Sequence, residues 1–125
     1  MSKQNPLILV IDDFQTTRDI IKNTLIKKGY KVIEAINGND ALKHFDGSEI
    51  DLVITDFNMP ELDGVGLIQK IRNDDRYKYI PILVLSTETN SDKKEKAMSA
   101  GATGWIVKPF EIAPFLKIVE KVVHV

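Results

Sequence analysis

The chain lacks cysteine, which excludes a disulfide framework, thiolate catalysis and a zinc site with cysteine ligands. It also lacks an excess of charge of one sign, because 17 Lys and Arg residues nearly balance 18 Asp and Glu residues. No overall field therefore attracts nucleic acid or an anionic membrane. Its apolar runs are far shorter than the roughly 20 residues of a membrane span, and the N-terminus has no cleavable signal pattern. We expect a cytoplasmic domain that is monomeric or weakly associating, without nucleic acid or membrane as a partner.

At 125 residues, of which 43% are apolar and 28% charged, the chain has the composition of an ordinary globular protein. This length favours one domain that is large enough to bury a substantial core. No linker, low-complexity segment or internal repeat is visible, and the chain ends directly after the last predicted helix. The expectation is a single domain over residues 1–125 without an output domain.

Short apolar runs alternate with longer amphipathic stretches along the chain. The runs predict strands, and the stretches, with recurring apolar residues at helical spacing, predict helices. The strands are expected over 7–12, 31–35, 52–56, 82–86 and 104–107, and the helices over 16–28, 39–46, 65–73, 92–100 and 113–123. This alternation is typical of an α/β domain with a parallel sheet covered on both faces. The mixed polarity of KVIEA at 31–35 favours a sheet edge, but the pattern does not give the order of the strands.

Polar residues follow four of the predicted strands at the point where each one ends. In an open parallel sheet, ligands bind beyond the carboxyl ends of the strands, so side chains from separate strands can converge there. The residues concerned are Asp12 and Asp13, Asp56, Ser86 and Thr87, and Lys108. Three carboxylates, hydroxyl groups and one lysine predict a metal-assisted site for an anion.

Each of these residues also has a simpler interpretation. An aspartate before a helix commonly caps it, which would account for Asp12 or Asp13, and Lys108 could be a solvated surface lysine. The position of Asp56 at the end of another buried run shifts the balance toward a shared site. Carboxylates brought together raise one another's pKa unless a cation is present, and Mg²⁺ prefers such oxygen ligands. The backbone carbonyl of Asn58, two residues on, could reach the same ion.

Four motifs together resemble one known family. IDD at 11–13, DFNMPELDG at 56–64, LSTE at 85–88 and AGATGWIVKPF at 100–110 are similar to the receiver domain of two-component response regulators. The similarity covers essentially the whole chain and is greatest to the single-domain, chemotaxis-type (CheY-like) members. It implies a five-stranded parallel sheet in the flavodoxin-like order 2-1-3-4-5, with helices on both faces.

The resemblance also implies roles for the strand-end residues. Asp56 would accept a phosphoryl group from a histidine kinase, and Lys108 would pair with that group. Asp13, Asp56 and the Asn58 carbonyl would ligate Mg²⁺, with Asp12 acting through a coordinated water. Thr87 can add hydroxyl or backbone hydrogen bonds to the bound group. The Lys108–Pro109 peptide bond would be cis.

A conformational switch is the next implication. Ser86 would hydrogen-bond the phosphoryl group, and Trp105 would move into the space vacated, changing the surface of the fourth helix, fifth strand and fifth helix. Ser86 and Trp105 stand where the family more often has threonine and tyrosine or phenylalanine. A downstream target protein would bind this face through Lys93, Ala97, Trp105 and the last helix.

Three alternatives to a chemotaxis regulator remain open at this stage. In the first, the domain passes its phosphoryl group to a histidine phosphotransfer protein. Asn58 and Glu88, which flank the site as in chemotaxis members, discriminate poorly between the two roles. An aspartate-nucleophile phosphohydrolase would need a second aspartate two residues after Asp56, where Asn58 stands. A flavin binder would need a Ser/Thr/Gly-rich loop after the first strand, where acids occur. We therefore predict signalling rather than enzymatic turnover of small substrates.

Overall fold

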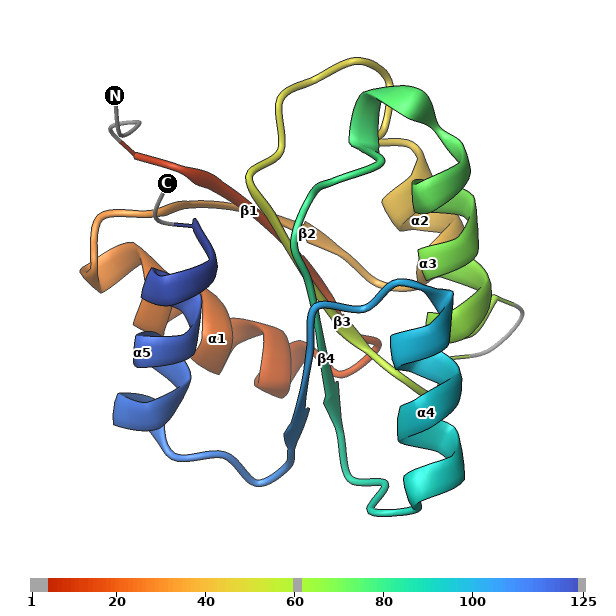
Figure 1. Cartoon of the computed structure of the whole chain (residues 1–125). Coiled ribbons are helices and arrows are strands. Elements are labelled where there is room, and N and C mark those ends of the chain that lie inside the picture. The colour runs from red at the N-terminus through yellow and green to blue at the C-terminus, as the bar shows by residue number, and fades with distance from the viewer. Residues whose placement is uncertain (1–4, 60–61, 124–125) are drawn as a thin grey trace.

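The computed structural model describes residues 5–59 and 62–123. Its centre is a five-stranded parallel sheet in the order β2-β1-β3-β4-β5 (Figure 1), which confirms the predicted fold and places the 31–35 strand at an edge. The strands are β1 (Leu7–Ile11), β2 (Lys31–Ala35), β3 (Leu52–Asp56), β4 (Ile82–Ser86) and β5 (Gly104–Val107). The three central strands are almost wholly buried, as their continuous aliphatic runs require.

Helices cover both faces of the sheet (Figure 1). The helix pair α1 (Gln15–Lys27) and α5 (Ile112–Val123) packs on one face, where Leu25 and Phe115 meet alternate residues of the central strands. The other face carries α2 (Gly38–Leu42), α3 (Gly64–Asn73) and α4 (Ser91–Ala100). Because strand side chains alternate between faces, the two cores are separate and share the sheet between them.

The predicted helix over 39–46 is wrong at its end, since α2 stops at Leu42. The backbone N–H groups of Lys43, His44 and Phe45 each donate to the carbonyl three residues earlier, so the chain tightens into turns. A short 3₁₀ helix, η1 (Asp75–Tyr77), was not predicted. Within the described residues, no helix has the length and apolar character needed to cross a membrane.

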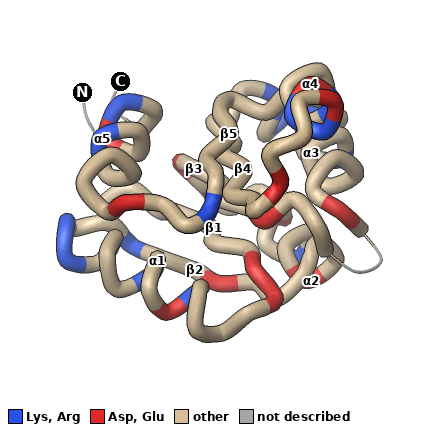
Figure 2. Tube along the Cα trace, turned by 90° about the horizontal axis from the view of Figure 1, so that it is seen from below, with Lys and Arg blue, Asp and Glu red and all other residues tan. Residues whose placement is uncertain are grey.

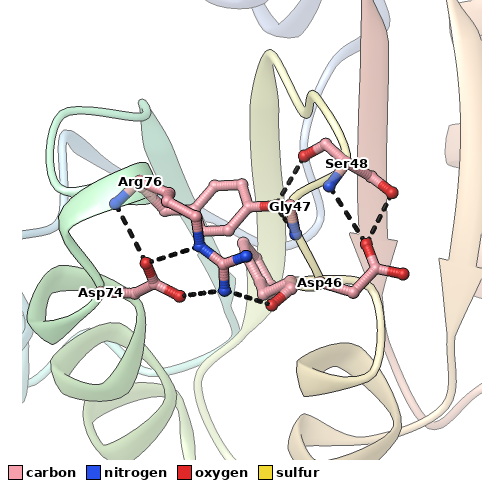
Figure 3. A network of polar contacts seen from close by, with 7 residues as sticks. Asp46, Gly47, Ser48, Asp74 and Arg76 are labelled. Carbon is pink, nitrogen blue, oxygen red and sulfur yellow. Dashed lines mark hydrogen bonds and ion pairs between the residues drawn. The ribbon is translucent and has the colours of Figure 1, made fainter.

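We call the end of the sheet where the strands begin its amino edge, and the end where they finish its carboxyl edge. At the amino edge, a polar network joins the α2–β3 loop to η1 (Figure 3). The Tyr77 hydroxyl donates to the Ser48 carbonyl oxygen at 2.6 Å and accepts from the Gly47 N–H at 2.9 Å. Arg76 donates to Asp74 through Nε at 3.1 Å and Nη2 at 2.8 Å, and Nη2 also reaches the Phe45 carbonyl oxygen at 3.3 Å. This network lies at the end of the sheet opposite the predicted site.

Candidate functional site: an acidic cluster at the carboxyl edge of the sheet

The carboxyl ends of the strands bring the predicted residues to one edge of the sheet. Asp12 directly follows β1, Asp56 ends β3, Ser86 ends β4 and Lys108 directly follows β5. Asp56 pairs with Leu85, so Ser86 lies one residue beyond it on the neighbouring strand. Figure 2 views the molecule from this side and shows acidic and basic segments close together near the ends of β1 and β5.

Three carboxylates form the centre of the site. One oxygen from each of Asp12, Asp13 and Asp56 lies within 4.8 Å of the others. Asp12 is buried, with 1% of its surface exposed, whereas Asp13 is open to solvent and Asp56 is half-buried. Carboxylate oxygens at this spacing are the donor set that a hard divalent cation such as Mg²⁺ prefers, so the residues present fit that ion.

Lys108 supplies the positive charge beside these carboxylates. Its Nζ lies 2.8 Å from Asp12 Oδ2 and 3.8 Å from Asp56 Oδ1. The Lys108 side chain is 15% exposed, so the interpretation as a solvated surface lysine is wrong. The Lys108–Pro109 peptide bond is cis, as the resemblance implied.

The capping interpretation of Asp12 is also wrong. The N-cap of α1 is Phe14, which makes no side-chain cap bond. Asp12 Oδ1 instead accepts the Phe14 N–H at 2.9 Å, and this bond turns the chain away from the end of β1. Arg18 Nη1 donates to the Asp12 carbonyl oxygen at 2.8 Å, so the strand-to-helix loop is held from both sides.

The protonation of Asp56 reflects competing neighbours. Burial raises the pKa of the Asp56 carboxyl above its usual value, and the Asp12 and Asp13 carboxylates act in the same direction. The Lys108 ammonium and the Phe57 N–H, which donates to Asp56 Oδ1 at 2.8 Å, oppose this shift. One lysine does not balance three acids, so the site favours an added cation.

The remaining predicted residues differ in exposure. Ser86 is fully buried, and its Oγ accepts the Glu88 N–H at 2.9 Å. Thr87 and Asn58 are exposed beside the site, in the β4–α4 and β3–α3 loops. The structure therefore brings Asp12, Asp56 and Lys108 into contact, and places Thr87 and Asn58 at the margin.

Trp105 is half-buried in β5, and its ring meets the Phe57 ring edge-on at a centroid distance of 5.1 Å. Phe57 follows Asp56 directly, so one residue contacts both the Asp56 carboxylate and Trp105. The inclusion of Ala97 in the partner face is wrong, because Ala97 is completely buried in the core. Lys93, from the same predicted face, is half-buried and pairs with Glu88 at 2.9 Å.

Sequence reasoning missed two residues that support the site. The role of Phe57 could have been predicted, since this residue follows Asp56 immediately and its N–H must face some acceptor at the strand end. No pattern in the sequence indicates the role of Arg18, because its contacts join α1 to the carboxyl end of β1 and to Glu34 of β2 at 3.4 Å. Such contacts depend on which helix covers which strand.

Comparisons with known proteins agree with this geometry. Residues 8–120 match the model of the response regulator receiver domain. The chain is 45% identical to the chemotaxis protein CheY1 of Helicobacter pylori over 105 residues, covering 82% of this chain and 85% of that protein. It is 38% identical to CheY of Pseudomonas aeruginosa over 116 residues, or 92% and 94% of the two chains. The structure of CheY4 of Vibrio cholerae matches with a TM-score of 0.89 at 37% identity, covering 94% and 98%.

The fold, the acidic edge and these matches define a phosphorelay signalling domain: the chain belongs to the response regulator receiver domain family. Within that family it is homologous to the chemotaxis response regulators of the CheY type. Such domains are signalling proteins that interact with histidine kinases and downstream targets, and they bind Mg²⁺ at an acidic pocket. This membership sets aside the phosphohydrolase and flavin-binding alternatives.

Proposed function

We propose that this protein is a stand-alone chemotaxis regulator whose Asp56 accepts a phosphoryl group from a histidine kinase. The observation that carries the proposal is the cluster of Asp12, Asp13 and Asp56, whose oxygens lie within 4.8 Å of one another beside Lys108. The chain covers 85% and 94% of two relatives that are chemotaxis proteins of the CheY type, which supports a role in chemotaxis. Location in the cytoplasm stays a prediction of the sequence.

In the proposed reaction, an Asp56 oxygen attacks the phosphorus of a phosphohistidine. A P–O bond to Asp56 forms while the P–N bond to the imidazole breaks, and the imidazole nitrogen keeps the bonding electrons. Little covalent work is required of the protein, so catalysis is mostly positioning and charge neutralisation. Mg²⁺ held by Asp12, Asp13, Asp56 and the Asn58 carbonyl would offset the negative charge of the phosphoryl oxygens.

The other residues of the site respond to the new charge. Lys108 lies 3.8 Å from Asp56 Oδ1 and can exchange part of its contact with Asp12 for the phosphoryl group. Ser86, one residue past the strand partner of Asp56, can turn its hydroxyl toward a phosphoryl oxygen. Thr87 lies in the exposed loop that follows, where its polar groups can contact the same oxygens.

The signal leaves through α4, β5 and α5 in this proposal. Movement of Asp56 is transmitted to the Phe57 ring and from there to Trp105, which contacts it. Ser86 acts in parallel through the start of the α4 segment. A target protein gains affinity only if it contacts the two states differently. We expect affinity for that target to rise when beryllofluoride and Mg²⁺ are added, and equal affinities would contradict the switch.

The test of the acceptor is phosphorylation by acetyl phosphate with Mg²⁺, comparing the natural chain with Asp56→Asn. We expect labelling of the natural chain and none of the variant, because an amide cannot form the acyl phosphate. Asp51→Asn is the matched control, since Asp51 precedes β3 at the opposite edge of the sheet. Undiminished labelling of Asp56→Asn would overturn the assignment.

A further inference from the structure

The Ser86 hydroxyl is linked to helix α4 by a short chain of polar contacts. Ser86 Oγ accepts the Glu88 N–H at 2.9 Å, and the Glu88 carboxylate accepts from Lys93 Nζ at 2.9 Å. Lys93 lies in the first turn of α4. The loop between β4 and α4 is therefore fixed at its start by a site residue and at its end by a helix residue.

Helix α4 itself is well anchored, so it can act as the fixed end of this series of polar contacts. Asn90 caps it by accepting the Asp92 N–H at 2.8 Å, and Ala97 is completely buried against the core. A lysine in the first turn is disfavoured by the helix dipole, whereas a carboxylate there is favoured. The Glu88 carboxylate offsets this cost for Lys93, which gives the ion pair a defined place at the helix start.

We propose that Lys93 is a positioning residue that, through Glu88, restrains Ser86 in the conformation of the unmodified protein. This inference rests on the proposed function, because it concerns the turn of Ser86 toward a group on Asp56. Turning the Ser86 hydroxyl toward that group requires the Glu88 N–H to follow it or lose its acceptor. Lys93 resists either movement by holding the Glu88 side chain, so it opposes activation.

The size of the expected effect on beryllofluoride binding follows from the exposure of the Lys93–Glu88 ion pair. The side chains of Lys93 and Glu88 are 42% and 29% exposed, so water partly screens the ion pair and it is weak. Removing it shifts the balance between the two states by about two- to fivefold. Lys93→Ala should therefore bind beryllofluoride about two- to fivefold more tightly in the presence of Mg²⁺, and the difference should vanish in high salt.

The experiment is a titration with beryllofluoride and Mg²⁺ followed by fluorine NMR of the bound ligand. Lys93→Arg keeps a cation that can reach Glu88 and should restore the natural affinity, whereas a role in helix packing would not predict this rescue or the salt dependence. Lys94→Ala is the matched control, because Lys94 is exposed and forms no ion pair with any residue that the structure describes. Glu88→Gln should match Lys93→Ala, and the double variant should show no further gain.

The outcomes separate the two proposals. If the natural chain binds beryllofluoride and Asp56→Asn does not, the proposed function stands. Unchanged or weaker binding by Lys93→Ala would then overturn the positioning role alone. If the natural chain fails to bind beryllofluoride, the proposed function fails and this inference falls with it. A gain in Lys94→Ala equal to that in Lys93→Ala would also overturn it, since the effect would reflect net charge.

Discussion

The two ends of the sheet differ in how far their charged side chains are neutralised by neighbouring groups. At the amino edge, Arg76 holds Asp74 through two nitrogens, and these contacts lower the pKa of the Asp74 carboxyl. At the carboxyl edge, three carboxylates share Lys108, and the pKa of Asp56 is raised. The first network is complete within the protein. The second leaves negative charge uncompensated, which is typical of a site that awaits a ligand.

The largest difference between the two edges should appear when the lysine of the site is removed. Lys108→Met leaves the buried Asp12 carboxylate without its partner, and breaking such a pair costs roughly 3 kcal/mol of unfolding free energy. We expect this loss in urea unfolding with EDTA, and a smaller one with Mg²⁺, because the ion replaces the missing charge.

Lys22→Met is the matched control for that measurement. Lys22 also pairs with a carboxylate, Glu34 at 3.3 Å, but its side chain is 39% exposed. Its removal should cost at most about 1 kcal/mol. Equal losses in the two lysine variants would show that burial does not distinguish the site from the rest of the surface.

A second test concerns the amino edge alone. Tyr77→Phe removes a hydroxyl that serves both the Gly47 N–H and the Ser48 carbonyl, and the loss of these two hydrogen bonds costs about 0.5–1.5 kcal/mol for each. Phosphorylation by acetyl phosphate should stay unchanged, because the hydroxyl lies at the opposite edge. Tyr79→Phe, at a residue 90% exposed, is the control and should leave the urea midpoint where it was. A loss of phosphorylation in Tyr77→Phe would contradict the separation of the two edges.

These two edges also differ in how much the sequence predicts. The residues of the carboxyl edge could be predicted, because each follows a buried apolar run whose end is visible in the pattern. The contacts of the amino edge could not, since Tyr77 and Ser48 are 29 residues apart in the chain and show no periodic pattern. Even in the site, nothing in the sequence indicates that Lys108 lies closer to Asp12 than to Asp56.

The same contrast holds for the elements. Strand bounds were predicted to within a residue, because aliphatic runs of this kind have one way to be buried in a parallel sheet. The end of α2 was missed, because three successive bonds to carbonyls three residues back replace the helical pattern after Leu42. Ala97 was misplaced, since a small residue is compatible with either face of a helix until its packing is known.

The raised pKa of Asp56 gives a smaller, pH-dependent test. Its folded pKa lies above the unfolded value, so its contribution to stability is complete below the unfolded pKa and is lost as pH rises through the folded pKa. Asp56→Asn carries no such charge. In EDTA we therefore expect the variant to become more stable than the natural chain as pH rises, by less than the loss in Tyr77→Phe.

Unfolding by urea at a series of pH values measures this difference. Mg²⁺ should reduce it, because the ion binds the ionised natural site and stabilises the folded state. Asp74→Asn should show the opposite pH dependence of stability. The lowered pKa of the Asp74 carboxyl gives the natural chain stability that is present above the unfolded pKa and lost as pH falls through the folded pKa. A gain for Asp56→Asn that is constant across pH would contradict the electrostatic origin.

The smallest effect is expected from the charge of the amino edge itself. Arg76→Met removes the contacts with Asp74 and the Phe45 carbonyl, yet the Arg76 side chain is 55% exposed and water replaces what is lost. The Tyr77 hydroxyl bonds remain, so the loop stays attached to η1. We expect a slight fall in the urea midpoint at low salt that disappears at about 1 M salt, where the screening length is only ~3 Å. A fall as large as that of Tyr77→Phe would mean that the arginine, and not the buried hydroxyl, holds this edge together.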